Sequence, residues 1–270
     1  NYLNFTDLAD CAVLRKKIMR AREETEKAGA PLKCAMTADI NGISMGQRDV
    51  LIDCGVEFLY MNIHCHHGMY PLFKNQTAYF WENAEGKRLL VWNGEHYHLG
   101  NRLGIRPNRV YVDSVWREPD TESGAAAMRS NLKAYLDECE NEGYPYDFII
   151  ISVSGVYSDN SPPEPEIARV IEAYNRMYPD EAELQMVTLG ELYDKIRDRL
   201  SDSPVYRGDL TDWWANGVGS TPYALKHFKQ AQHRYSLCSR LDAGCAEKYP
   251  ALAECAEENL LLYAEHTWGH

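Results

Sequence analysis

The residues best suited to chemistry are an acid and a histidine that follow predicted elements near opposite ends of the chain. Asp39 comes directly after a short apolar run, and His266 follows a leucine-rich helical pattern. Carboxylates at the carboxyl ends of buried strands, together with histidines, are typical of carboxylate-driven or metal-assisted active sites. Asp39 can equally cap the turn at Asn41-Gly42, and His266 can be a surface residue at a helix end.

A histidine-rich segment lies between them. Residues 62–109 are rich in aromatic residues, Asn, Gly and His, and include His96 and His98. Two residues apart on a strand, such histidines share one face, where they can chelate a metal, donate to hydroxyl groups of a ligand or pack with aromatic rings. We expect a β-hairpin excursion over the mouth of the site, because this composition is typical of a polar ligand pocket. The predicted substrate contacts are Trp92, Asn93, His96 and His98.

A second acid follows the most apolar run of the chain, 147–152. Asp159 lies in the subsequent loop together with Tyr157, and two prolines close that loop. Asp159 is therefore either a turn residue or a reactive carboxylate, with Tyr157 a candidate substrate contact. Farther along, Trp213 is either a core residue or a ring that stacks on the apolar face of a bound ligand.

Strand and helix patterns alternate up to Pro204, as expected of an α/β protein. Apolar runs predict strands at 32–38, 56–61, 88–92, 110–113, 147–152 and 184–187. Periodic patterns predict helices at 6–28, 45–54, 124–142, 164–177 and 189–200. Runs without polar interruption indicate strands buried on both faces, hence a largely parallel sheet covered by helices. Helices at 222–240, 242–248 and 251–265 then follow with no strand between them.

Bulk composition limits the partners. The chain has 270 residues, 45% of them hydrophobic, and can bury a full core. Its net charge of −12 argues against nucleic acid and anionic membrane surfaces. We recognise no signal peptide and no apolar run near the roughly 20 residues that span a bilayer. Eight scattered cysteines without a Cys-x-x-Cys pair argue against a zinc ribbon and favour reduced thiols in the cytoplasm.

The segments around Asp39 and His266 resemble signatures of glycoside hydrolase family 38, the zinc-dependent retaining α-mannosidases. Asp39, Gly42 and Ser44 match the strand-end motif of the family's nucleophile, although the family's usual proline and aromatic residue are replaced. The helix that ends at His266 resembles the one that supplies a zinc-ligating histidine. The family's His-x-His-x-Asp motif is absent and would precede Asn1, so the chain reads as an internal part of a longer polypeptide.

The resemblance implies a retaining glycosidase acting on an oligosaccharide or glycoside. Asp39 would be the nucleophile and a metal ligand, Asp159 the general acid/base, and His266 a further zinc ligand. Retaining chemistry places the two carboxyl groups about 5–5.5 Å apart. The expected fold is a (β/α) barrel of about seven strands that lacks its first strand, over 1–205, followed by a three-helix subdomain over 206–270.

Two other functions remain open from the sequence. The chain can be an inactive relative that binds carbohydrate without turning it over. It can also be a metal-dependent polysaccharide deacetylase, whose barrel is similar and whose metal ligands are also Asp and His.

Overall fold

The computed structural model describes residues 6–39, 43–62, 72, 74–106, 110–112, 115–117, 120–155, 161–210 and 218–265. By packing, the chain forms two compact units. Unit 1 consists of Asn1–Asn93 and Arg197–His270, and unit 2 of Gly94–Ile196. The helices after Pro204 thus pack in the same unit as the sheet. The limits of these units differ from those of the predicted domains, 1–205 and 206–270. Whether the predicted domains fold independently stays a prediction.

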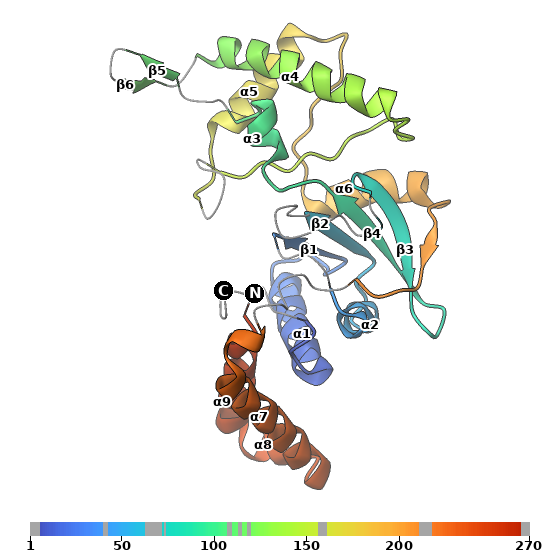
Figure 1. The fold of residues 1–270 in the computed structure, drawn as a ribbon, viewed down its shortest axis with the longest axis vertical. Helices are drawn as coiled ribbons and strands as arrows, with labels where there is room; N and C mark the ends of the chain where they lie inside the picture. Colours follow the sequence, from blue (N-terminus) through green and yellow to red (C-terminus); the bar gives the residue numbers. More distant parts are fainter. Residues whose placement is uncertain are drawn as a thin grey trace. The chain divides into compact units, whose positions relative to one another are not determined.

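Unit 1 is built on a five-stranded sheet with the order β1-β2-β4-β3-β7 (Figure 1). Its strands are β1 (Cys34–Ala38), β2 (Phe58–Asn62), β3 (Thr77–Glu82), β4 (Arg88–Gly94) and β7 (Val205–Tyr206). β1 is parallel to β2, β3 is antiparallel to β4, and β7 is parallel to β3. The fold is therefore mixed α/β, and a barrel of about seven strands stays a prediction.

Strands β3 and β4 form the hairpin expected within 62–109. Asn83 begins its turn by accepting hydrogen bonds from the N–H groups of Glu85 and Lys87, at 3.0 and 2.9 Å. Gly86 supplies the left-handed conformation, with φ 78°. The expectation of an excursion is wrong for this hairpin, because both strands are members of the main sheet. Their side chains on both faces are mostly buried, including Trp81 and Trp92, so the hairpin builds the core instead of covering a pocket.

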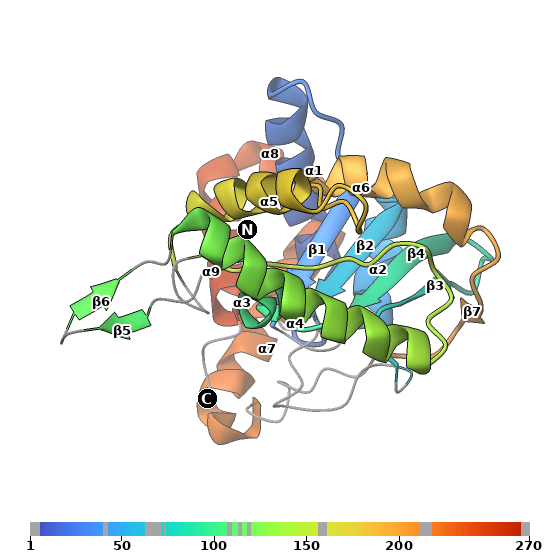
Figure 2. The ribbon, with the colours of Figure 1, turned by 90° about the horizontal axis from the view of Figure 1, so that it is seen from above.

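β4 lies next to β2 within the sheet (Figure 2). The N–H of Leu90 donates to the carbonyl of Glu57 at 3.1 Å, so the two strands start at the same edge and run in the same direction. The carboxyl ends of β1, β2 and β4 therefore meet at one edge of the sheet. In α/β folds this edge is where ligands bind.

The helices of unit 1 are α1 (Cys11–Lys27), α2 (Met45–Asp53), α7 (Pro222–Leu241), α8 (Cys245–Lys248) and α9 (Pro250–Tyr263), with a 3-10 turn at Arg197–Leu200. The predicted helix at 6–28 begins later, because Asp10 caps it by accepting from the N–H of Ala12 at 3.0 Å. Thr6, at which the predicted helix begins, instead accepts from the N–H of Ser44 at 2.8 Å. Ser44 in turn caps α2.

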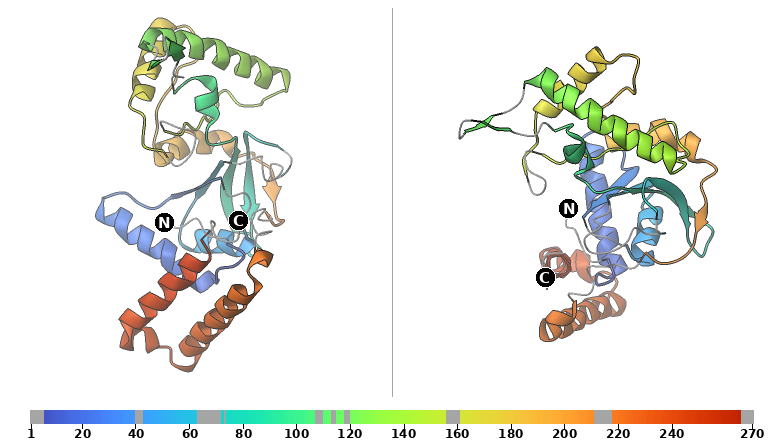
Figure 3. Two further views of the ribbon diagram at one scale, coloured as in Figure 1. Left: turned by 60° about the vertical axis from the view of Figure 1, so that its left-hand side comes forward. Right: turned by 45° about the horizontal axis from the view of Figure 1, so that its top comes forward.

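The three helices predicted after Pro204 are confirmed. α7 and α9 lie side by side (Figure 3), and α9 also contacts α1. A cluster of buried side chains joins these helices to the segment before α1, with Leu8, Val13, Phe228, Leu260 and Leu261 among its members. None of the helices in the described part of the chain has the length and hydropathy that a bilayer crossing needs.

Unit 2 contains α3 (Leu99–Leu103), β5 (Val110–Val112), β6 (Val115–Arg117), α4 (Thr121–Asn141), α5 (Glu166–Met177) and α6 (Leu189–Ile196). β5 confirms a predicted strand but pairs with β6 in a separate two-stranded sheet. Thr188 and Glu191 form the capping box that begins α6, with the Glu191 carboxylate accepting from the N–H of Thr188 at 2.8 Å.

The predicted strands at 147–152 and 184–187 are wrong, since the described backbone there is not strand. Ile151, Val153 and Leu184 are nevertheless partly buried, because they pack against the cluster that joins α3, α4 and α5, whereas Met186 and Val187 are exposed. The carbonyl of Ser152 accepts from the N–H of Gly100 at 2.9 Å. The Ser152 carbonyl therefore pairs with α3, where the sequence predicted pairing with a neighbouring strand.

Candidate functional site

Asp39 follows the last residue of β1, at the edge where the parallel strands end. Its backbone N–H donates to the carbonyl of Asn62, the last residue of β2, at 3.2 Å. Its φ of 75° lies in the left-handed region, which costs a non-glycine residue free energy. The chain thus turns sharply at the predicted nucleophile, and the side chain is half-buried. Strain of this kind is concentrated at functional sites.

Buried amide side chains occupy the same edge of the sheet. Asn62, Asn93 and Gln76 are 2%, 0% and 4% exposed. The Gln76 side-chain oxygen accepts from the indole N–H of Trp92 at 3.2 Å, and the Asn93 amide donates to the carbonyl of Lys74. Buried polar groups need such partners. The segment before β3 is therefore tied to the end of β4.

This placement changes the role expected of Trp92 and Asn93. Both side chains are fully buried in the described structure. They hold the backbone at the edge of the sheet, and direct contact between either residue and a sugar stays a prediction. The sequence did not point to Asn62 and Gln76, because a single Asn or Gln forms no recognisable motif. Their positions at this edge become apparent only once the order of the strands is known.

Ile43, the first described residue after Asp39, lies beside Leu210. The N–H of Ile43 donates to the carbonyl of Leu210 at 2.8 Å. Nearby, burial and then the neighbouring carboxylate of Asp209 raise the pKa of Asp7. The start of the segment that contains Trp213 is therefore tied to the end of the Asp39 loop. Trp213 itself lies outside the described residues.

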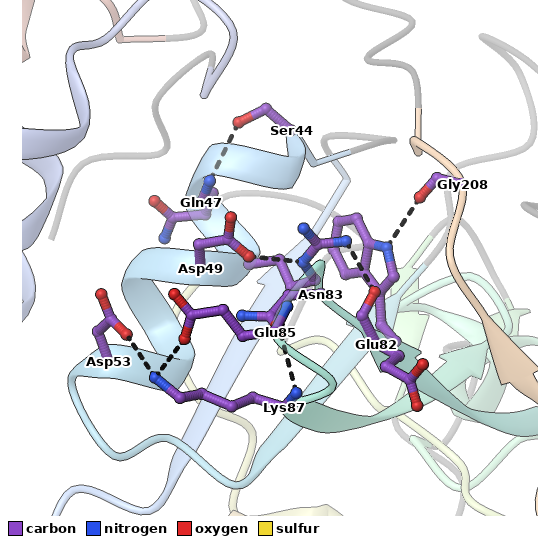
Figure 4. A network of polar contacts seen from close by, with 11 residues as sticks. Ser44, Gln47, Asp49, Asp53, Glu82, Asn83, Glu85, Lys87 and Gly208 are labelled. Atoms are coloured by element: carbon purple, nitrogen blue, oxygen red, sulfur yellow. Dashed lines mark hydrogen bonds and ion pairs between the residues drawn. The ribbon is translucent and has the colours of Figure 1, made fainter.

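A polar network holds the opposite edge of the sheet, around the hairpin turn (Figure 4). The buried Arg48 guanidinium pairs with Asp49 at 2.8 Å, donates to the carbonyl of Glu82 at 3.1 Å and lies over the Trp81 ring. Lys87 pairs with Asp53 at 3.8 Å, which joins the turn to the end of α2. Because these groups surround the amino ends of the strands, we assign the network a structural role.

In unit 2, His96 and His98 lie in the turn between β4 and α3. The expectation that a strand holds them on one face is wrong, yet the turn brings their rings together, with centroids 3.8 Å apart and the two Nδ1 atoms facing each other. Tyr97 packs on His96 at 4.2 Å between centroids. The backbone N–H of His98 donates to Nδ1 of His96 at 3.2 Å, so the turn itself fixes the position of the His96 ring.

The turn leads directly into α3, which contacts the segment before Asp159. The Asn101 side chain forms hydrogen bonds with Ser154 and Gly155, and residues 156–160 follow. Asp159 and Tyr157 lie outside the described residues, so their distances to other groups stay untested. Asn101 was also missed by sequence reasoning, because an Asn within a short helical pattern resembles any solvated residue.

His266 likewise lies outside the described residues, immediately after Glu265. Partial burial lowers the pKa of Lys17 on α1 to about 8, and the Glu265 carboxylate acts in the opposite direction. Of the predicted zinc ligands, Asp39 alone belongs to the described chain, and the described residues contain no group of three metal-binding side chains. A zinc site stays a prediction that depends on residues outside this part of the chain.

Comparison with known proteins supports the fold. No model of a protein family and no curated protein matches the sequence. Among solved structures, the chain is similar to an alpha-mannosidase from Enterococcus faecalis V583, with a TM-score of 0.67 and 16% identity over 98% of this chain and 29% of that one. The alpha-amylase AmyC from Thermotoga maritima matches with a TM-score of 0.41 and 12% identity, over 83% of this chain and 51% of that one. The chain thus has the fold of a segment, under a third in length, of the first of these proteins.

Proposed function

We propose that the chain forms the middle of the catalytic region of a retaining, zinc-assisted glycoside hydrolase of the family 38 type, acting on an α-mannoside or a related glycoside. The observation that carries this proposal is the position of Asp39. It follows a strand at the carboxyl edge of a parallel pair, within a fold shared with a segment of an α-mannosidase. Active-site carboxylates of α/β folds occupy that edge.

In the proposed reaction, the Asp39 carboxylate attacks the anomeric carbon and forms a glycosyl ester while the leaving oxygen departs. Asp159 gives its proton to that oxygen. It then removes a proton from the water that hydrolyses the ester, which returns both carboxyl groups to their starting states. A zinc ion, when bound, would be held by Asp39 and His266 and would polarise the sugar hydroxyls.

The proposed sugar contacts fall into two groups. His96 and His98 reach hydroxyl groups through their ring nitrogens, and Tyr157 and Trp213 contribute from the loops that contain them. Trp92 and Asn93 support the same edge from inside the sheet. The seven described cysteines are free thiols, which suits the proposed cytoplasmic location.

The test uses the full natural polypeptide with a panel of aryl glycosides. Asp39→Ala should lower kcat by several orders of magnitude, with azide restoring turnover by attacking in place of the missing carboxylate. Asp53→Asn is the matched control, since this carboxylate pairs with Arg15 at 2.5 Å near the other edge of the sheet. Wild-type binding of glycans without turnover would favour the carbohydrate-binding relative, and acetate release from acetylated glycans would favour the deacetylase.

A further inference from the structure

We infer that unit 2 carries a second carbohydrate-binding site, in a hollow lined by α4, α5 and the turn that follows α5. Its ligand is an uncharged stretch of an oligosaccharide. None of the residues that line the hollow is among the proposed catalytic groups or sugar contacts. The choice of a glycan as ligand rests on the proposed function, and the charges of the hollow narrow that choice to a neutral one.

The hollow is preformed. α4 and α5 lie side by side, and a space of about 280 Å³ remains between them and the turn (Figure 2). The Asn175 side chain holds the turn, because its oxygen accepts from the N–H of Leu184 at 3.0 Å and its nitrogen donates to the Leu184 carbonyl at 2.9 Å. The N–H of Glu181 also donates to the carbonyl of Tyr178 at 3.1 Å. A ligand therefore orders few groups when it binds.

Apolar side chains line part of the hollow. Leu132 is 4% exposed, Leu136 packs on the cluster that joins α3, α4 and α5, and Ala182 adds a methyl group from the turn. The ring C–H groups of a pyranose are apolar, so their transfer from water onto these side chains is favourable. The volume lies near the lower limit of ligand pockets, roughly 300–1,000 Å³, and suits a short stretch of glycan better than a large cofactor.

Two ion pairs also line the hollow. The Arg129 guanidinium donates twice to one oxygen of Glu181, from Nε at 2.7 Å and from a terminal nitrogen, and the Tyr174 hydroxyl donates to the other oxygen at 3.4 Å. The hydrogen bond from Arg129 lowers the pKa of Glu181, so this group is a carboxylate at neutral pH. On α4, Lys133 donates to both oxygens of Asp137, at 3.0 and 3.2 Å.

This pairing favours an uncharged ligand. A carboxylate offers about four acceptor sites, a guanidinium five donors and an ammonium three, so both pairs can still bind hydroxyl groups. A hydroxyl donates and accepts at once, and it can bridge an acid and a base without separating them. An anion would have to displace a carboxylate from Arg129 or Lys133. An organic cation would find a face of the Tyr178 ring covered, since the Arg129 guanidinium lies 4.6 Å from the ring centre.

The experiment measures binding by the full natural polypeptide that carries Asp39→Ala, in which the proposed turnover is blocked. The neutral probe is α-mannotriose. Trisaccharides of galacturonic acid and of N-trimethylated glucosamine are the anionic and cationic probes. We expect α-mannotriose to bind, and each charged probe to bind at least about 10-fold more weakly, because its charge would separate an ion pair or lack a partner. Equal or tighter binding of a charged probe would overturn the ligand class.

Two variants assign the binding to the hollow. Glu181→Gln and Asp137→Asn keep the shape of the side chain but remove a charged acceptor, so each should weaken α-mannotriose binding by about 10-fold. Asp137 lies at an exposed position of α4, so its variant is expected to stay folded. Glu122→Gln is the matched control, since Glu122 pairs with Arg176 at 3.1 Å between the same two helices and does not line the hollow.

Hydrogen exchange locates the ligand independently. Adding α-mannotriose should slow exchange at 178–184 in the Glu122→Gln polypeptide, and should leave it unchanged in the two variants of the hollow at the same probe concentration. Absence of α-mannotriose binding, or equal binding by all three variants, would overturn the inference.

A turnover assay separates this inference from the proposed function. With Asp39 intact, Glu181→Gln should leave kcat and KM for an aryl mannoside at their wild-type values, because the variant changes no proposed catalytic group. A fall in kcat would show that the hollow is not a separate binding site. If the wild-type polypeptide hydrolyses no glycoside, the proposed function fails, and the titrations with α-mannotriose still decide whether the hollow binds a glycan.

Discussion

The backbone N–H of Asp39 donates to the carbonyl of Asn62 at 3.2 Å, so the predicted nucleophile is attached to the last residue of the neighbouring strand. The strand register continues up to this point, with Ala38 opposite Asn62, and the chain then turns at a φ of 75°. The carboxylate therefore leaves a rigid sheet at a defined position. A catalytic group placed in this way loses little conformational entropy when the substrate binds.

The left-handed conformation of Asp39 predicts that function and stability conflict at this residue. Asp39→Gly should abolish turnover yet leave the free energy of unfolding equal to or above that of the wild type, because glycine adopts this φ without steric cost. Asp39→Ala should lower the free energy of unfolding by about 1 kcal/mol. Urea denaturation of both variants measures the difference. If alanine proves as stable as glycine here, the backbone is not strained.

Gln76 is expected to stabilise the edge of the sheet through Trp92. Gln76→Ala removes the acceptor of the buried indole N–H, which should cost about 1–3 kcal/mol of unfolding free energy. The fluorescence of Trp92 should shift as the surroundings of its ring change. Gln230→Ala is a suitable control, since Gln230 lies on an exposed position of α7. Equal stability of the two variants would contradict the assigned role.

The lowered pKa of Lys17 predicts that the protein becomes more stable at alkaline pH. Its pKa is about 8 in the folded chain, against an ordinary value of 10.5, so the unfolded chain binds more protons between these values. The free energy of unfolding contributed by this group therefore increases as the pH rises through that window. Lys17→Met should remove this increase and should be the more stable protein at pH 7.

Lys27 provides the control for that titration. It is exposed on the same helix, and its hydrogen bond to Glu24 raises its pKa. Its stabilising effect is thus present at neutral pH and declines only above the ordinary lysine range. Lys27→Met should leave the pH dependence between 8 and 10.5 intact. Unfolding curves at several pH values compare the two variants, and a wild type with no increase would refute the lowered pKa.

Metal removal provides a separate test of the zinc ligands. Chelation should abolish turnover by the full natural polypeptide, lower its Tm by removing a ligand of the folded state, and be reversed by added zinc. His266→Ala should reproduce the loss of activity. The 270-residue chain alone should bind zinc weakly, because the His-x-His-x-Asp motif is absent from it. Full activity after complete chelation would contradict the metal-assisted mechanism.

Local signals in the sequence determined most of the helices. The capping box of Thr188 and Glu191, the cap at Ser44 and the prolines at the starts of α7 and α9 act within a few residues of themselves. The strand that ends before Asp39 was also predicted from its largely apolar run, although β1 is only half-buried and Met36 is exposed. These features depend on short stretches of chain, and a sequence displays such stretches directly.

Tertiary structure alone decided which segments share a surface. The apolar run at 147–152 predicts a strand, but its partner is a helix, and the hairpin of β3 and β4 belongs inside the sheet. Asn62 meets Asp39 across 23 residues of sequence, and Asn101 meets Ser154 across 53. Hydrogen bonds between such distant residues depend on how the elements pack, since neither a backbone carbonyl nor a carboxamide has a fixed partner until folding brings one within reach.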